Sequence, residues 1–413
     1  MSGKAVTPGG ALSGVRVIDM SRVLGGPFCG QILADHGADV IKVEPPMGDE
    51  TREWGPPFRA GADGSVVSSA YFMGTNRNKR GIALDLKHPR AREVCLELFA
   101  TTDVVIENFK VGTMEKWGLG YADALAERFP RLIYCRITGF GPDGPLGKLP
   151  GYDAVAQAMT GLISITGMPQ SGPVRMGAPI VDLGSGMNAA LGIAMALYER
   201  ERSGLGQLID ITLFDTGLSF LHPHSANWLE DGRLAPLSGN AHPNIAPYDL
   251  FPTRTRPIFL GIGNDRQFAI AARVLGAPHL AKDPRFASNA MRKEHTRDLT
   301  AELSALLAEW DGDELARLLL EAGVPAGPAN TVAQALSDPH TRHRGMIAEL
   351  DGYRGIASPI KLARSRPRTR KAPPAFAADN HDVLAEAGFD EETIAELLAC
   401  GAVVAKRRTG GSD

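Results

Sequence analysis

Hydrophobic and polar residues in the first half of the chain follow the alternating pattern of strands and helices. Five short apolar runs have strand character, namely residues 15–20, 39–44, 81–86, 103–109 and 132–140. Helical runs separate them, such as 25–38, where Pro27 suits the first turn and Gly37 ends the helix. Because apolar strands that alternate with helices favour a parallel sheet covered on both faces, the pattern predicts an α/β fold.

The second half is richer in helices, and its pattern suggests a change of domain. We expect helices or helical regions at residues 153–163, 184–202, 265–322 and 391–399, with a strand at 258–263. We place a large domain at residues 1–219 and a smaller α/β domain at 220–335. The remainder, 336–413, is expected to return to the large domain.

Composition and charge narrow the class of protein. The 413 residues are 44% hydrophobic and 22% charged, with a formal net charge of -3, so nothing indicates a nucleic-acid partner. The sequence shows no signal-peptide pattern and no long apolar run, so we expect a soluble, cytoplasmic protein without a membrane partner. Cys29, Cys95 and Cys135 lie in helix or strand patterns and are expected to be buried, reduced thiols.

The turn after the first predicted strand has some features of a dinucleotide site. Glu44 ends the second strand at a distance typical of an acid that binds ribose. The turn itself, however, reads Gly25-Gly26-Pro27 with Gly30 following, and Pro27 lacks an amide for pyrophosphate. A nicotinamide or flavin site is therefore disfavoured, although an anion near this helix start remains reasonable.

A basic stretch, "NRNKRG", precedes the third predicted strand. Its cations are Arg77, Lys79 and Arg80. Such a run is most often a solvated loop, but arginine and lysine beside amide donors also suit a phosphate clamp. Both readings stay open.

Asp153 in "GYDAVAQAM" stands where a glycine- and proline-rich loop enters a helix. An aspartate there is a favoured helix cap. The same position, near amide donors and the positive end of the helix dipole, also suits a carboxylate nucleophile. No histidine occurs between His88 and His222, and "HPH" at 222–224 has no neighbouring cysteine or paired acid, so we predict no metal site.

Taken in order, several motifs resemble the class III coenzyme A-transferases, a family that also includes the α-methylacyl-CoA racemases. They are "RVLGGPF", "GADVIKVE", "NRNKRGIALDL", "ENFKVGTMEKWGLGY", "GYDAVAQAMTGL" and "GNAHPNIAPYDLF", spread over nearly the whole chain. "TREWGPPF" and "PVRMG" are most similar to the branch that moves CoA from succinyl-CoA to dicarboxylates of the glutarate, hydroxymethylglutarate or itaconate type.

The resemblance implies a Rossmann-like large domain, a smaller α/β domain and an interlocked homodimer. It implies that Asp153 is a covalent nucleophile that carries first the acyl group and then CoA. Acyl-CoA and a carboxylic acid are then the substrates, and no permanently bound cofactor is expected.

The family holds CoA along its first domain, which identifies the candidate CoA-binding residues by position. They are Val23, Leu24, Gly25, Arg77, Lys79, Arg80, Asn108, Phe109 and Lys116. This chain departs from some members at Leu24, where they carry glutamine, and at Lys116, where they carry arginine. Leu24 has no side-chain donor, so backbone amides are the expected oxyanion donors.

For the dicarboxylate, the candidate substrate-binding residues are Arg52 and Arg175, because arginine fits a distal carboxylate best. The resemblance adds Gly239, Asn240 and His242, at the position of a glycine-rich lid in some members. Two alternatives remain. A racemase needs a second acid/base group, and the region about one helix upstream of Asp153, where the racemases carry a histidine, has none here, so Asp123 or Glu127 would have to substitute with a much altered pKa. A non-catalytic CoA-binding protein would leave Asp153 without a role.

Overall fold

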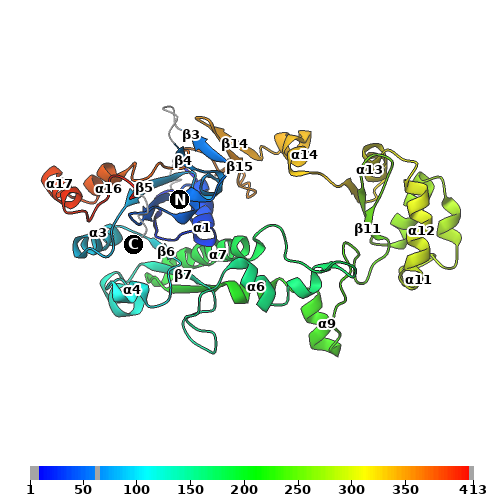
Figure 1. Cartoon of the computed structure of the whole chain (residues 1–413), viewed down its shortest axis with the longest axis horizontal. Helices are drawn as coiled ribbons and strands as arrows, with labels where there is room; N and C mark the ends of the chain where they lie inside the picture. The colour runs from blue at the N-terminus through cyan, green and yellow to red at the C-terminus, as the bar shows by residue number, and fades with distance from the viewer. Residues whose placement is uncertain (1–8, 61–65, 409–413) are drawn as a thin grey trace, which may run out of the picture. The chain divides into compact units, whose positions relative to one another are not determined.

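The structure is a computed structural model that describes residues 9–60 and 66–408. The chain divides into two compact units, each with its own core (Figure 1). The large unit comprises Met1–Thr160, Met176–Leu221 and Arg342–Asp413, and the small unit comprises Gly161–Arg175 and His222–Thr341. The segment Gly161–Arg175 thus groups with the small unit, whereas the sequence placed it in the large domain.

A six-stranded parallel sheet forms the centre of the large unit, as the sequence predicts. Its strands are β1 (Arg16–Asp19), β2 (Asp39–Glu44), β5 (Lys79–Ala83), β6 (Val104–Glu107), β7 (Ile133–Thr138) and β10 (Leu208–Thr212). The order across the sheet is β10-β7-β6-β1-β2-β5, with every neighbouring pair parallel. Counted along the chain, this is the Rossmann order 3-2-1-4-5-6, whose direction reverses between β1 and β6.

Helices cover both faces of this sheet, because alternate strand residues point to opposite sides. The first face carries α1 (Gly25–Asp35) and α7 (Ile180–Ser203); the second carries α3 (Pro89–Ala100), α16 (Asn380–Glu386) and α17 (Glu391–Ala399) (Figure 1). Val17 packs in the first of these cores and its neighbour Ile18 in the second, both fully buried.

The C-terminal segment supports the outer strand of the sheet. Asp379 accepts a hydrogen bond from the Gly81 amide (2.7 Å), and Asn380 accepts one from the Ala83 amide (3.0 Å). An isolated bridge joins Leu84 to Val403. The edge of β5 is therefore covered by its own chain.

Shorter elements complete the large unit. They are the helices η1 (Glu50–Glu53), α2 (Ala70–Thr75), α4 (Thr113–Lys116), η2 (Tyr121–Leu125), α5 (Ala126–Arg128), α6 (Asp153–Met159) and α8 (Leu213–Ser219), and the strands β3 (Phe58–Ala60), β4 (Val66–Ser69), β14 (Ile347–Leu350) and β15 (Tyr353–Ile356). The strand pairs β3–β4 and β14–β15 are both antiparallel.

The small unit is built on a three-stranded antiparallel sheet. Its order is β11 (Tyr248–Phe251), β12 (Ile258–Gly261) and β13 (Ala326–Pro328). The other elements are η3 (Ile163–Ile165), β8 (Gly167–Met168), β9 (Gly172–Pro173), α9 (His224–Asp231), α10 (Asp265–Val274), η4 (Pro278–Lys282), α11 (Asn289–Glu294), α12 (Thr296–Leu307), α13 (Gly312–Glu321) and α14 (Val332–Ser337); α15 (Pro339–His343) crosses into the large unit. The region 265–322, expected to be helical, is thus several helices.

Two helices near Asp153 differ in length from the prediction. Helix α6 ends at Met159 rather than residue 163, because Gly161 adopts a left-handed conformation (φ 91°) just beyond it. Helix α7 begins at Ile180, four residues earlier than expected, directly after Pro179. The first turn of α7 consequently includes Val181 and Asp182.

Helix α7 is also the one helix of residues 9–60 and 66–408 that is long and apolar enough to cross a membrane. A single helix of this kind is weak evidence for a span, since core helices share the same composition. Here Ala189 and Ile193 are buried against the sheet, and the helix packs on α1. The exposed apolar side chains of α7 lie on its other side.

The cysteines allow a simple test of this packing. Cys29, Cys95 and Cys135 have no exposed surface, and burial raises the pKa of the Cys95 thiol to about 12. Cys400 is exposed. We expect iodoacetamide at pH 8 to alkylate Cys400 alone in the native protein and all four cysteines after denaturation, as read by peptide mass spectrometry. Rapid native labelling of any of the other three would contradict the packing.

Candidate active site

Asp153 is the first residue of α6 and is buried, with 8% of its surface exposed. It makes no capping bond to its own helix, whose cap position is Tyr152. Instead its Oδ2 atom accepts hydrogen bonds from the amides of Val181 (2.8 Å) and Asp182 (3.1 Å) in the first turn of α7. The aspartate therefore caps a different helix from the one that the sequence suggested.

Gln157 fixes the other oxygen of this carboxylate. Its Nε2 donates to Asp153 Oδ1 (2.6 Å), and its Oε1 accepts from the Met176 amide (2.9 Å). Gln157 follows Asp153 by one helical turn and is 1% exposed, so its orientation is set by packing. Three donors thus converge on the Asp153 carboxylate and fix its orientation.

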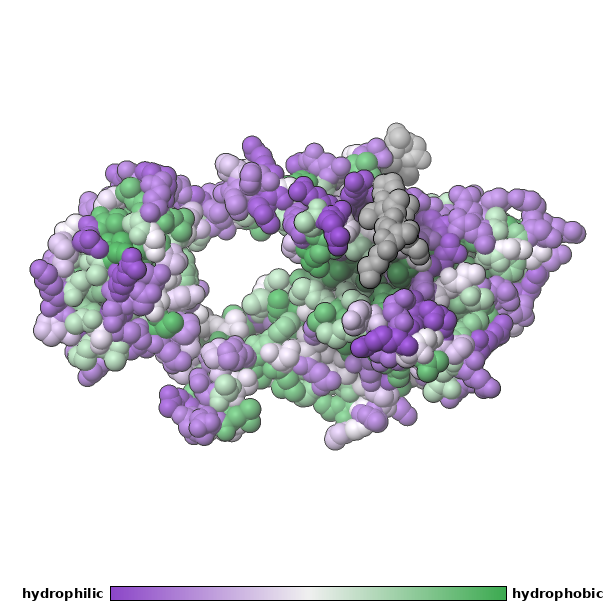
Figure 2. Space-filling model, turned by 180° about the vertical axis from the view of Figure 1, so that it is seen from behind, coloured by the Kyte–Doolittle hydropathy of each residue, from purple (hydrophilic) through white to green (hydrophobic). Residues whose placement is uncertain are grey.

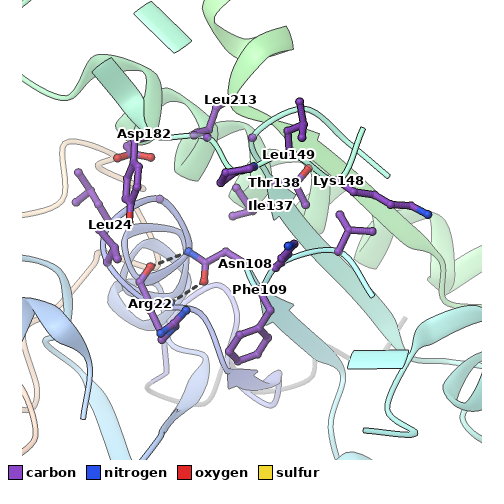
Figure 3. Close-up of a pocket in the computed structure, with 18 of the residues that line it drawn as sticks. Arg22, Leu24, Asn108, Phe109, Ile137, Thr138, Lys148, Leu149, Asp182 and Leu213 are labelled. Atoms are coloured by element: carbon purple, nitrogen blue, oxygen red, sulfur yellow. Dashed lines mark hydrogen bonds between the residues drawn. The ribbon is translucent and has the colours of Figure 1, made fainter. Parts of the chain in front are cut away.

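A pocket of about 240 Å³ lies next to this residue: Gly151, Tyr152 and Asp182 line it, whereas Asp153 itself does not. It lies at the carboxyl ends of β1, β6 and β7, where the strand order reverses and where open α/β sheets bind ligands. Tyr152 and Asp182, the neighbours of Asp153 in chain and in hydrogen bonding, both line it. Figure 3 shows Asp182 and Leu24 on one side of the pocket and Lys148 with Leu149 on the other.

The loop between β1 and α1 forms one wall and is held in a strained conformation. Val23 has φ 69°, which is a true outlier for a β-branched residue. Asn108 clamps the preceding residue, since its side chain accepts from the Arg22 amide (2.8 Å) and donates to the Arg22 carbonyl (2.7 Å) (Figure 3). Strain of this kind persists where surrounding contacts impose it and is typical of ligand-binding loops.

Two glycines bring the start of α1 against the start of α7. A Cβ atom at Gly186 would lie 2.5 Å from the Gly25 carbonyl oxygen, and one at Gly25 would lie 3.2 Å from the Asp182 carbonyl oxygen. Leu24, at the cap position of α1, makes no side-chain capping bond. The first amides of α1 have no acceptor within their own helix, and their role as oxyanion donors stays a prediction.

Asp182 is a second carboxyl group in this wall. Burial, and then the charge of Asp153, raise the pKa of Asp182 to about 7. Tyr71 lies nearby, and burial followed by the charges of Asp182 and Asp153 raises the pKa of its phenol. The site thus pairs a hydrogen-bonded carboxylate with a carboxyl group that is partly protonated at neutral pH.

The outer pocket carries the cations. Arg22, Lys110 and Lys148 line it, and Arg22 is paired with Glu50 (2.6 Å) and lies over the Phe109 ring (5.6 Å). Phe109 also forms the wall of a second, mostly apolar pocket of about 110 Å³. That pocket is further lined by Met20, Leu86 and Trp117.

The sequence-predicted CoA residues divide into two groups. Val23, Leu24, Gly25, Asn108 and Phe109 all line the 240 Å³ pocket, although the Asn108 side chain is occupied with the Arg22 backbone. Lys116, at the end of α4, is exposed and does not line it.

The "NRNKRG" cations have a different role from the predicted phosphate clamp. Arg77 pairs with Asp35 (2.5 Å), Lys79 with Asp19 (2.8 Å), and Arg80 with Asp39 (2.7 Å) and Glu386 (2.8 Å). Arg77 and Lys79 are almost fully buried, and none of the three cations lines the pocket. The phosphate reading of this stretch is corrected accordingly: these are internal ion pairs.

Arg52 requires the same correction as a substrate-binding candidate. It is 2% exposed, holds Glu44 with two hydrogen bonds (2.6 and 2.7 Å) and stacks on the Phe72 ring (3.7 Å). Arg52 does not line the pocket, and a guanidinium held in this way cannot reach a substrate there.

The remaining substrate-binding candidates, Arg175, Gly239, Asn240 and His242, belong to the small unit. There the Gly239 amide donates to the Gly167 carbonyl (2.9 Å), and Gly239 itself is left-handed (φ 62°). His242 packs edge-on against Tyr248 (5.2 Å), and burial and then Lys293 lower its pKa. Their role in binding stays a prediction.

Sequence reasoning missed Asp182, Lys148 and Thr138 as pocket residues. Asp182 lies in the first turn of α7, and an acid at that position of a helix is a recognisable signal. The sequence prediction started this helix at residue 184, so Asp182 was left outside it. Among the described residues, no group of three or more histidine, cysteine, aspartate or glutamate side chains could hold a metal ion.

The fold is a doubly wound α/β fold with a pocket at the switch point of its parallel sheet. The chain belongs to CoA-transferase family III, whose model matches residues 12–380. It is 41% identical to a succinate–glutarate CoA-transferase of Agrobacterium fabrum, over 92% of this chain and 97% of that protein. It is 37% identical to succinyl-CoA:glutarate CoA-transferase of Mus musculus, over 96% and 91% respectively.

Among solved structures, a CAIB/BAIF family protein from Brucella suis superposes with a TM-score of 0.84 at 41% identity, covering 92% of this chain and all of that one. The resemblance seen in the sequence motifs is confirmed, and the protein is a CoA-transferase.

Proposed function

We propose that this protein transfers CoA from succinyl-CoA to a short dicarboxylic acid through a covalent intermediate on Asp153. The relatives named above act on succinate, succinyl-CoA and glutarate by their names. The observation that carries the proposal is the Asp153 carboxylate, held by the two amides of α7 and by Gln157 between Tyr152 and Asp182, which line the pocket.

In the first half of the reaction, a carboxylate oxygen of Asp153 attacks the thioester carbonyl of the donor. The C–S bond breaks, giving a mixed anhydride and CoA thiolate. The thiolate then attacks the Asp153 carbonyl, the bond to the bridging oxygen breaks, and succinate leaves an aspartyl-CoA thioester behind.

The second half repeats these steps in reverse with the acceptor. Its carboxylate attacks the thioester, CoA thiolate is displaced to give a new anhydride, and the thiolate attacks the acceptor carbonyl. Asp153 is regenerated with no net proton transfer. Covalent catalysis of this kind divides one difficult exchange into steps of similar energy.

We place CoA along the outer pocket. The thioester arm lies against Val23, Leu24 and Gly25, whose α1 amides face the developing oxyanion. The nucleotide lies by Phe109, with Lys110 and Lys148 beside its phosphates. Lys110 and Lys148 line the pocket and have no ion-pair partner among residues 9–60 and 66–408.

Arg175 is the proposed partner of the distal carboxylate of the dicarboxylate, and Gly239, Asn240 and His242 are the proposed lid. We also propose a homodimer, interlocked as in the resembling family. Exposed apolar side chains on α7 and around α6 support this, since an uncovered patch marks an interface. They are Tyr152, Val155, Met159, Met187, Leu191 and Met195. Figure 2 shows hydrophobic residues at the surface of the molecule seen from behind.

The test is a panel of acyl-CoA donors and carboxylic acceptors, read by mass spectrometry of the CoA products. We expect succinyl-CoA with glutarate or a similar dicarboxylate to give exchanged thioesters. The same samples in deuterated buffer report on racemisation: exchange at the α-carbon without transfer would establish the racemase alternative. If neither reaction occurs, the non-catalytic CoA-binding role is the alternative that remains.

A further inference from the structure

We infer that the Asp182 carboxyl group, in its protonated form, donates a hydrogen bond to the incoming carboxylate and thereby orients the acceptor acid toward Asp153. This inference rests on the proposed function, because it assigns the acceptor a place beside the covalent intermediate. Nothing in the family resemblance pointed to this residue.

The position of Asp182 is fixed by backbone contacts on two sides. Its amide donates to Asp153 Oδ2 (3.1 Å), so the backbone of Asp182 contacts the nucleophile directly. A Cβ atom at Gly25 would lie 3.8 Å from its Oδ1, which places that oxygen at the start of α1. The side chain therefore lies between the nucleophile and the helix start proposed as oxyanion site.

The carboxyl group of Asp182 belongs to the pocket wall and makes no pair with another described side chain. It lines the pocket, and no hydrogen bond or ion pair to its side chain occurs within the described part of the chain. A partly buried carboxyl group without a protein partner is costly, and a ligand that accepts its proton in a hydrogen bond removes that cost.

The ionisation state of Asp182 determines whether a carboxylate ligand can bind beside it. When Asp182 is ionised, it repels a carboxylate that approaches Asp153, as Asp153 and Asp182 repel each other. When it is protonated, its O–H is a donor in a site where a carboxylate must come close. Burial and the charge of Asp153 raise the pKa of Asp182 to about 7, so both states occur near neutral pH.

Several other charged groups face the same space. Asp153 on α6 and Tyr71 on α2 interact electrostatically with Asp182, while Lys110 and Lys148 line the outer pocket. Arg22 and Glu50 form an ion pair there. Glu107, at the end of β6, does not line the pocket, but burial raises its pKa to about 7 as well, and burial lowers the pKa of Lys79 to about 8.

These states predict the pH dependence of acceptor binding. Below pH 7 the protonated Asp182 binds the acceptor; above it the anion repels. We expect the acceptor KM of the native enzyme to rise above pH 7 with a slope that approaches about tenfold per pH unit, with little change in the KM of the donor. A flat acceptor KM between pH 6.5 and 8.5 would overturn the inference without any variant.

Two substitutions separate the donor from the charge. Asp182→Asn keeps a donor and cannot ionise, so its acceptor KM is expected to stay constant within about threefold over that range. Asp182→Ala loses the donor, and its acceptor KM is expected to rise about 10- to 100-fold at pH 6.5. An alkaline rise that persists in Asp182→Asn would refute the role.

Glu107→Gln is the matched control, because burial raises the pKa of Glu107 to about 7 as well. The alkaline rise must survive in this variant; if it disappears, Glu107 is its source and the inference fails. Incubation with succinyl-CoA alone tests the underlying function, through a mass increase on Asp153. Its absence would defeat the proposed function itself, whereas an adduct with the wrong pH profiles would defeat only the role of Asp182.

Discussion

Asp153→Asn is expected to abolish CoA transfer, with kcat reduced by at least about 10³-fold. A carboxamide is not a nucleophile toward a thioester, and no second carboxylate is held by the α7 amides. The amide oxygen of asparagine can still accept from Val181 and Asp182, so the start of α7 stays capped. The measurement is initial rate at saturating donor and acceptor, together with CoA affinity and thermal unfolding.

The control for this substitution is Asp123→Asn, which removes an equal charge from an exposed side chain that does not line the pocket. It is expected to retain native turnover. Native protein treated with succinyl-CoA and then hydroxylamine is expected to carry a hydroxamate at Asp153, and the Asn variant none. Turnover above a tenth of native in folded Asp153→Asn would exclude the covalent mechanism.

Arg52→Met is expected to reduce stability strongly and to leave substrate affinity unchanged. Removing the guanidinium leaves Glu44, 1% exposed, without its cation, and breaking a buried ion pair in this way costs about 3–5 kcal/mol. A lower midpoint of urea unfolding, followed by circular dichroism, measures the first effect. The acceptor KM, taken at a temperature where the variant is folded, measures the second.

The double variant Glu44→Gln with Arg52→Met gives the matched comparison. It removes both charges, so the buried carboxylate no longer lacks a partner, and part of the lost stability is expected to return. A large increase in acceptor KM without loss of stability in Arg52→Met would restore the sequence-based role of Arg52 in binding the dicarboxylate.

The basic residues show where the sequence misleads. Arg52, Arg77 and Lys79 carry the charges and neighbours of an anion site, and a linear sequence does not reveal whether a cation faces a ligand or a carboxylate. Their partners, Glu44, Asp35 and Asp19, lie 8, 42 and 60 positions away. Only the tertiary structure shows that these residues, distant along the chain, form buried ion pairs.

Asp153 shows the converse. The helical spacing of apolar residues after it, together with the motif order, was enough to single it out. Its capping partner was not predictable, because the α7 amides lie 28 and 29 residues further on and belong to a helix whose predicted start was too late.

By itself, the sequence determined the parallel α/β sheet, the helix that begins at Gly25 and the family, because each depends on local periodicity or on motif order; it also supplied the hypothesis that Asp153 is the nucleophile. The tertiary structure alone decided which cations face the pocket, which helix Asp153 caps, and that Asp182 lies beside it. Those properties depend on contacts between distant segments and on burial, and burial sets whether a charge is paired, solvated or left for a ligand.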